Sequence, residues 1–200
     1  WYQPLGDLVL EFPGHEAATD FRRELDLDAA VARTTYRVGG TTFVREVLSS
    51  APDQVIIVRL ACDRPGGLTF SAQLTRAESA EALTLPDGSL ELRGQADRGK
   101  PTAGVAFVAQ MHAETEGGRV ASADGRLRIE RADAVTLRLT AGTDYFGEPA
   151  GARATRDLAA ARRRALTALR DAHTTDHQKL FRRVTLELGR TPGEAAALPT

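Results

Sequence analysis

Apolar and polar residues alternate along most of the first 141 residues, the pattern of strands that bury one face. Alternating runs cover residues 8–12, 25–31, 68–74, 105–111, 127–129 and 135–139, and residues 55–62 are largely apolar on both faces. The runs are separated by turn dipeptides that supply positive φ angles, such as Gly39-Gly40, Asp87-Gly88, Gly117-Gly118 and Asp124-Gly125. Many short strands without intervening helices predict an all-β fold, an antiparallel β-sandwich or barrel, of which we expect the sandwich.

The period changes to three and four after Gly151. An apolar stripe predicts an amphipathic helix over residues 158–172, formed by Leu158, Ala161, Ala165, Leu169 and Ala172. Thr175 and Gln178 stand at capping-box spacing, so we expect a helix break at 174–176 and a short second helix after it. Alternation then returns at residues 184–188. The predicted organisation is a β-sandwich over 1–150, a helical linker region over 151–182, a returning strand over 183–189 and a linker over 190–200.

Composition narrows the possible partners. The chain has 200 residues, a formal net charge of −1 and a single cysteine, Cys62. The balanced charge argues against nucleic acid and anionic membrane as partners, and one cysteine allows neither an internal disulfide nor a thiolate metal cage. No run approaches the ~20 apolar residues of a membrane-spanning helix. Because Trp1 opens the chain in place of methionine, we expect a processed protein or an excised piece.

Candidate catalytic carboxylates are few. A glycosidase needs two carboxylates that face each other across a cleft. Glu24, Asp26 and Asp28 alternate along one expected strand and so share one face, where solvent or ion pairs with Arg22 and Arg23 are the expected surroundings. A second candidate pair is Asp7 with Asp144, although capping of a turn explains Asp144 equally well.

Other polar patterns have structural explanations. His173 and His177 are four residues apart, as zinc-binding pairs are, but the expected break between them and the lack of a third ligand favour capping over a metal site. The run Arg162–Arg164 is interpreted as a solvated helix face. Arg45 is expected to share the inward face of Phe43 and Val47, and burial there requires an acidic or carbonyl partner. The chain contains no phosphate loop, nucleophile elbow or dinucleotide fingerprint.

Particular strings resemble the N-terminal β-domain of glycoside hydrolase family 95, a family of α-L-fucosidases. They are YQPLGDL at 2–8, RELDL at 23–27, REV at 45–47, SSAPDQV at 49–55 and AGTDY at 141–145, followed by His173, Asp176, Leu180-Phe181, Arg183-Val184, Leu186, Leu188 and Gly189. The match runs in order over nearly the whole chain.

The resemblance implies an N-terminal β-super-sandwich and helical linker that precede an (α/α)6 catalytic barrel and a C-terminal β-domain. Enzymes of the family hydrolyse terminal α-L-fucosyl or α-L-galactosyl linkages with inversion, through a glutamic acid and an asparagine–aspartate pair that lie in the barrel, beyond Thr200. The resemblance therefore places no catalytic, cofactor-binding or metal residue in this chain and implies no cofactor. The expected partners are the oligosaccharide substrate of the parent enzyme and the barrel, against which the concave face of the sandwich would pack.

Two alternatives to this accessory role stay open. A stand-alone carbohydrate-binding module is favoured by Tyr2, Tyr145 and Phe146 near loops, although aromatic residues make up only 6% of the chain. A structural or self-associating module is the other. Extracellular or periplasmic localisation is favoured, because enzymes that degrade glycans commonly act outside the cytoplasm.

Overall fold

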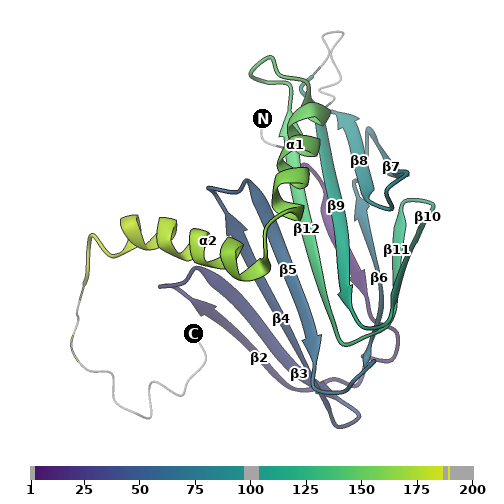
Figure 1. Cartoon of the computed structure of the whole chain (residues 1–200), viewed down its shortest axis with the longest axis vertical. Helices are drawn as coiled ribbons and strands as arrows, with labels where there is room; N and C mark the ends of the chain where they lie inside the picture. Colours follow the sequence, from purple (N-terminus) through teal and green to yellow (C-terminus); the bar gives the residue numbers. More distant parts are fainter. Residues whose placement is uncertain (1–2, 97–103, 187–188, 190–200) are drawn as a thin grey trace.

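Two antiparallel sheets form the protein in a computed structural model that describes residues 3–96, 104–186 and 189 (Figure 1). One sheet has eight strands in the order β2-β3-β4-β5-β12-β9-β8-β7, and the other has four in the order β1-β6-β11-β10. The strands are β1 (Asp7–Glu11), β2 (Thr19–Asp26), β3 (Val31–Val38), β4 (Thr41–Ser50), β5 (Val55–Cys62), β6 (Leu68–Thr75), β7 (Ala80–Thr84), β8 (Leu90–Gln95), β9 (Ala106–Glu116), β10 (Arg119–Ala123), β11 (Arg126–Ala132) and β12 (Ala134–Thr143). The predicted antiparallel β-sandwich is confirmed.

Three of the four expected turn dipeptides, Gly39-Gly40, Gly117-Gly118 and Asp124-Gly125, make tight hairpins, whereas at Asp87-Gly88 only Gly88 has a positive φ. Gly39 and Gly40 join β3 to β4 with φ angles of 53° and 85°, and Asp124 and Gly125 join β10 to β11 with 50° and 69°. Two consecutive positive φ angles match the right-handed twist of the flanking strands, which is why such pairs close hairpins.

The main core lies between the two sheets. It joins one face of the eight-stranded sheet, here called the inner face, to the four-stranded sheet, and includes Phe43, Leu60, Phe70, Met111 and Leu137. The opposite, outer face of β3, β4 and β5 carries a smaller second core. Val31, Leu48, Val55 and Ile57 pack there against Ala161 and Leu169 from two helices. The sheet is thus apolar on both faces at β4 and β5, as the largely apolar run in β5 indicated.

Two helices cover the outer face, but their boundary differs from the prediction. Helix α1 covers Ala150–Arg162 and α2 covers Leu166–Phe181, so the break falls at residues 163–165 and Thr175 lies inside α2. Both helices turn the same stripe toward the sheet, with Leu158 and Ala161 of α1 and Leu169 of α2 buried. Ala165, the member of the predicted stripe at the break, is exposed, but burial resumes at Leu169, so the apolar spacing in the sequence gives no sign of the break. Among the described helices, none is long and apolar enough to cross a membrane.

The expected strand over 25–31 is interrupted by a hairpin turn at residues 27–30, between the end of β2 and the start of β3. Oδ1 of Asp26 accepts hydrogen bonds from the backbone N–H groups of Asp28 (3.0 Å) and Ala29 (2.9 Å), and Ala30 has a φ of 52°. An aspartate that bonds the backbone two and three residues onward competes with the strand ladder and reverses the chain. The alternation across this turn does not report burial, since Leu25 and Leu27 are both exposed.

The expected returning strand is also absent from its described part. Residues 183–186 pair with neither sheet, and Val184 and Leu186 are exposed. A strand forms only where an edge offers it a partner, and alternation of a few apolar residues does not supply one. Residues 187 and 188 and the expected linker over 190–200 lie outside the described residues.

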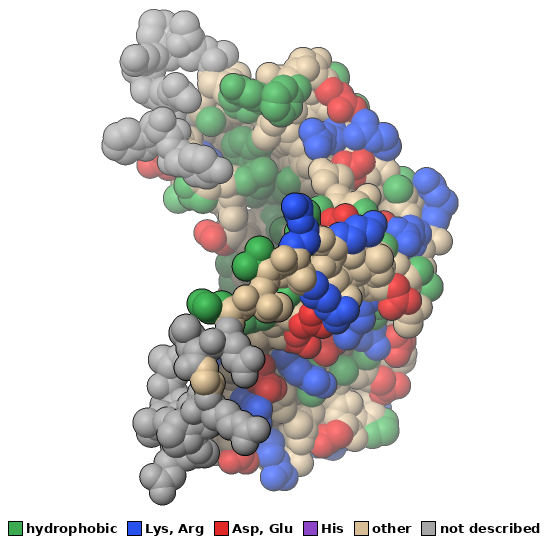
Figure 2. All heavy atoms as spheres, turned by 90° about the vertical axis from the view of Figure 1, so that its left-hand side faces the viewer, with side chains coloured by type: hydrophobic (Ala, Val, Ile, Leu, Met, Phe, Trp, Pro, Cys, Tyr) green, Lys and Arg blue, Asp and Glu red, His purple; other side chains and the backbone are tan. Residues whose placement is uncertain are grey.

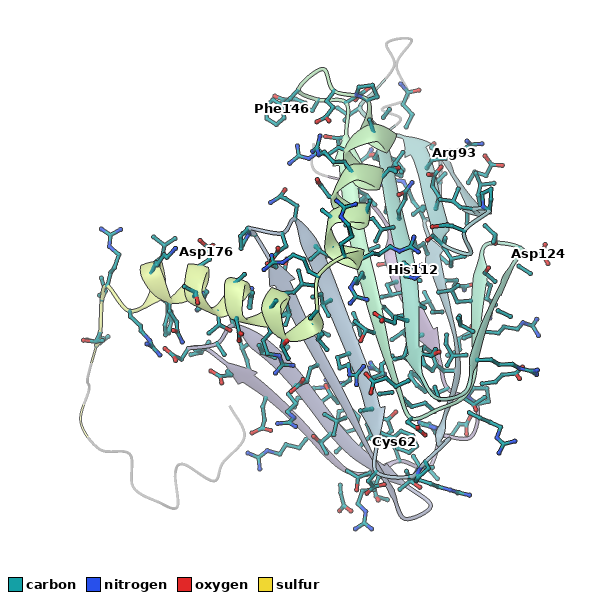
Figure 3. All side chains as sticks on the ribbon, viewed as in Figure 1. Cys62, Arg93, His112, Asp124, Phe146 and Asp176 are labelled. Carbon is teal, nitrogen blue, oxygen red and sulfur yellow. The ribbon has the colours of Figure 1, made fainter. Side chains whose placement is uncertain are left out.

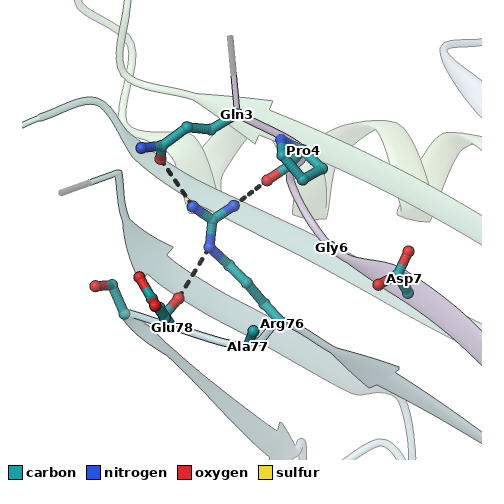
Figure 4. Close-up of a pocket in the computed structure, with 8 residues that line it drawn as sticks. Gln3, Pro4, Gly6, Asp7, Arg76, Ala77 and Glu78 are labelled. Atoms are coloured by element: carbon teal, nitrogen blue, oxygen red, sulfur yellow. Dashed lines mark hydrogen bonds between the residues drawn. The ribbon is translucent and has the colours of Figure 1, made fainter. Parts of the chain in front are cut away.

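Arg76 holds the N-terminal segment against the four-stranded sheet (Figure 4). Its guanidinium donates to the backbone oxygens of Pro4 and Glu78 and to Oε1 of Gln3, and it lies 4.8 Å from the ring centroid of Phe107. The hollow beside it measures about 240 Å³. These contacts engage the guanidinium of Arg76 within the chain. Arg76 therefore holds the N-terminal segment in place.

Candidate functional site

The candidate carboxylates do not form a catalytic pair. Glu24 and Asp26 share the outer face of β2 and line an open hollow of about 430 Å³ under α2, together with Glu46, Arg33 and Arg170. Each carboxylate there is already engaged. Arg22 bridges Glu24 at 2.6 Å, Arg33 and Arg170 pair with Glu46, and Asp26 holds its own turn. The expected ion pair with Arg22 is present, whereas Arg23 stacks over Phe21 at 4.9 Å.

Asp28 lies in the hairpin turn and not on the strand that was expected to carry it. Its carboxylate accepts two hydrogen bonds from Arg182, at 2.7 and 2.6 Å, and one from Gln178 at 2.9 Å. The hydrogen bond from Arg182 is the main reason why the pKa of Asp28 falls below its ordinary value. The residue therefore fastens the end of α2 to the β2–β3 turn.

Asp7 and Asp144 have different structural positions. Asp7 is exposed at the start of β1 and lines the hollow beside Arg76. Asp144 exchanges two hydrogen bonds with Ala106, through its Oδ1 at 2.9 Å and its N–H at 3.1 Å. Asp144 is thus a turn residue that extends the β9–β12 pairing, which is the simpler of the two explanations given by the sequence.

A serine, a histidine and an aspartate meet beside the outer face of the eight-stranded sheet, near the end of α1, and no pattern in the sequence predicts this cluster. Ser89 Oγ donates to Asp87 Oδ2 at 3.1 Å and lies 3.2 Å from His112 Nδ1, while Arg162 donates to Asp87 at 2.5 Å. Figure 3 shows His112 where α1 crosses β9.

This cluster cannot act as a nucleophilic triad. In such a triad the histidine accepts the serine proton and the acid orients the histidine. Here the proton of the Ser89 hydroxyl goes to Asp87 and Ser89 is fully buried, so no substrate can reach it. Burial, followed by the charge of Arg162, lowers the pKa of His112 and favours the neutral ring. The cluster connects the C-terminal end of α1 to the turn before β8.

The arginine run at the end of α1 is built into the fold. Arg162 pairs with Asp87 and Arg164 pairs with Asp53, so two of its three members connect the helix break to turns of the sheet. The interpretation as a solvated helix face is therefore wrong for Arg162 and Arg164. Arg138 is buried beneath the same break, where it bonds Glu114 at 2.6 Å and the backbone oxygen of Arg164 at 3.5 Å.

His173 and His177 lie on one continuous helix, contrary to the expected break, and their rings stack 6.5 Å apart. Nε2 of His173 is 3.1 Å from the backbone oxygen of Ala30, and Nε2 of His177 is 2.8 Å from that of Leu27. The Nε2 atom of each ring is thus used by a backbone carbonyl oxygen. Among the described residues, no group of three histidine, cysteine or carboxylate side chains could hold a metal ion.

An apolar rim surrounds the far end of α2. It consists of Leu27, Leu180, Phe181, Val184 and Leu186, each between 43% and 82% exposed. Phe181 stacks on His177 at 5.0 Å, and both line an open hollow of about 570 Å³. Asp176, labelled in Figure 3, lies on the same helix and lines the same hollow. A second exposed aromatic pair, Tyr145 and Phe146, follows β12. Exposed apolar groups gathered in this way are typical of a docking surface.

Comparison with known proteins gives one family match. The family described as "Glycosyl hydrolase family 65, N-terminal domain" matches residues 1–148. Among curated proteins, "Alpha-L-fucosidase 2" of Arabidopsis thaliana is 32% identical over 94% of this chain and 26% of its own length. "Probable alpha-fucosidase A" of Aspergillus niger is 24% identical over 100% of this chain and 27% of its own length. The chain thus spans about a quarter of the curated relatives it matches.

The fold recurs among solved structures. A "Putative kojibiose phosphorylase from human microbiome" superposes with a TM-score of 0.54 at 13% identity, over 82% of this chain and 25% of that one. At this identity the likeness concerns the fold alone. The resemblance to the N-terminal domain of fucosidase-type glycoside hydrolases is confirmed, and the matching family model carries the number 65.

Proposed function

The chain belongs to the family of glycosyl hydrolase family 65 N-terminal domains, and from this membership we propose that it is the non-catalytic N-terminal domain of a longer glycoside hydrolase of the α-L-fucosidase type. The parent enzyme would remove terminal α-L-fucosyl or α-L-galactosyl residues from glycans with inversion. The observation that carries the proposal is the 32% identity to an α-L-fucosidase along 94% of this chain.

The chemistry of the described residues supports an accessory role. Inverting hydrolysis needs an acid and a base on opposite faces of a sugar ring, separated by a cleft. Within residues 3–96 and 104–186, the candidate carboxylates Glu24 and Asp28 are engaged with arginines, and Asp26 and Asp144 accept hydrogen bonds from backbone amides. The acid and base of the parent would therefore come from another domain.

The apolar rim of α2 is proposed as the surface that packs against this catalytic domain. Phe181 and Leu180 project from the end of α2, and Val184 and Leu186 continue the exposed apolar line beyond it. A catalytic domain of the same polypeptide is the occupant we favour, because relatives with this domain are about four times as long. Helices α1 and α2 would then act as the linker region and residues 190–200 as the path toward the barrel.

The test compares this chain with the longer polypeptide encoded by the same gene, using an aryl α-L-fucoside. We expect turnover by the longer polypeptide only. Turnover by the 200-residue chain would refute an accessory role, and an inactive, folded longer polypeptide would refute the fucosidase assignment. In the longer polypeptide, Phe181→Asp should increase proteolysis between the domains, whereas Val120→Asp, on exposed β10, serves as the matched control.

A further inference from the structure

Asp176 on α2 is a half-buried carboxylate without a partner. Among the described residues, none donates a hydrogen bond to its side chain or forms an ion pair with it. The other half-buried carboxylates of the described chain are engaged, as Asp28 is with Arg182 and Asp53 is with Arg164. Burial of a carboxylate is costly unless a donor or an opposite charge replaces the lost water. The exception at Asp176 therefore indicates that a partner is missing.

The hollow around Asp176 does not supply this partner. It measures about 570 Å³, and its lining away from α2 consists of small uncharged residues, Ala30 of the β2–β3 turn together with Ser49 and Ala51 at the end of β4. The two histidines of α2 that line it direct their Nε2 atoms to backbone oxygens of the same turn. Among its described lining residues there is no lysine or arginine. The balancing charge therefore comes from outside the described residues.

The apolar groups beside Asp176 indicate which cation fits. Leu180 lies one helical turn after Asp176, so the two side chains are neighbours on the surface of α2, and Phe181 lines the same hollow. An arginine lays its methylene stem on apolar surface, bonds a carboxylate with its planar head and packs well on aromatic rings. The described fold already uses arginine in this way, because Arg76 lies 4.8 Å from the ring centroid of Phe107.

The surroundings of the hollow favour a folded domain as the source of this arginine. Figure 2 faces the side toward which α2 points in Figure 1, and hydrophobic side chains lie exposed on it. The nearby edge strand β2 has a bulge between Thr19 and Arg22, so it offers no regular row of backbone groups for strand pairing. A partner on this side would therefore meet side chains, and Val184 and Leu186 extend the apolar surface that it would cover.

We propose that an arginine of the catalytic domain enters this hollow and pairs with Asp176, with its stem against Leu180 and Phe181. The inference rests on the proposed function, because the longer polypeptide supplies the domain; relatives with this domain are about four times as long. The apolar rim provides contact area, and the ion pair fixes how the two domains are oriented. Enclosure by the rim removes water from the pair, which makes the attraction stronger than at an exposed site.

Asp176→Asn tests the pair, because it removes the charge and keeps the shape. In the longer polypeptide, proteolytic cleavage between the domains should become about tenfold faster, since the arginine is left enclosed without a counter-charge. Asp171→Asn is the matched control. Asp171 lies on the same helix, is exposed and does not line the hollow, so its cleavage rate should stay unchanged. Cleavage of Asp176→Asn at the unmodified rate, or more slowly, would overturn the proposal.

The unfolding midpoint of the 200-residue chain separates a lost interdomain pair from damage to the helix. Asp176→Asn should not lower this midpoint, because the carboxylate has no partner there to lose. A lower midpoint would show that Asp176 acts within this chain and would contradict the proposal. So would light scattering in which Asp176→Asn dissociates a dimer of the longer polypeptide, since the arginine would then belong to a second copy.

Fucoside turnover distinguishes this inference from the proposed function. A folded longer polypeptide without turnover would count against the fucosidase assignment and leave the cleavage result for Asp176→Asn valid. Faster cleavage of Phe181→Asp together with unchanged cleavage of Asp176→Asn would retain the docking surface and refute the ion pair.

Discussion

Leu169 is the main apolar anchor of α2, and its removal tests how the helix is held. It is fully buried in the outer core against Leu48 and Ile57, while the other buried residue of α2, His173, is polar. Truncation of a buried leucine to alanine costs the transfer of the lost methyl groups and leaves a cavity, together about 3–4 kcal/mol. For a protein of this size Leu169→Ala should lower the unfolding temperature by about 6–12 °C.

The matched control is Leu180→Ala on the same helix. Leu180 is 68% exposed, so the same change of side chain should alter the free energy of unfolding by less than about 0.5 kcal/mol. Urea unfolding followed by far-ultraviolet circular dichroism measures both variants. A loss below about 1 kcal/mol for Leu169→Ala, or equal losses for the two variants, would show that the outer core does not hold α2.

Two further predictions concern pH and backbone packing. Burial lowers the pKa of His112 and of His15 in the folded state. The free energy of unfolding should therefore be highest above about pH 6.5 and should decrease as the pH falls through the lower pKa values of the folded state. His112→Gln should reduce this dependence on pH in unfolding experiments across that range. Gly142→Ala should destabilise the protein by about 1–3 kcal/mol, because a Cβ there would lie 2.4 Å from the Ala150 backbone oxygen. Gly151→Ala in α1 has room for the added Cβ and should stabilise the protein slightly. Equal effects of the two variants in chemical denaturation would refute this packing argument.

The strands and their hairpins could be predicted because their cause is local. Alternation and paired glycines act within a few residues, and the confirmed turn at Gly39-Gly40 needs only its own φ angles. The failures have equally specific causes. The turn after Asp26 depends on the two hydrogen bonds that one side chain accepts, and the helix break at 163–165 leaves the apolar spacing between Ala161 and Leu169 in phase. Neither changes the hydrophobic pattern, so a reading of that pattern misses both.

Side-chain clusters were harder to predict because they join distant parts of the chain. Ser89, His112 and Arg162 meet only once a turn, a strand and a helix end are in place. Arg45 is the exception, because its position between Phe43 and Val47 already placed it inward. What the sequence could not supply was the partner, which is absent from the described residues as well.

The bulge in β2 bears on how the protein behaves in a concentrated solution. Asp20 has a φ of 52° at this bulge, and Arg22 and Glu24 follow it along the strand. The bulge and the charged side chains make the β2 edge a poor template for pairing with a strand of another molecule. Edge-to-edge aggregation through β2 is therefore disfavoured. If overproduced material precipitates, the regular edge of the four-stranded sheet at β1 is the place to protect first, for example by introducing a lysine at Val9.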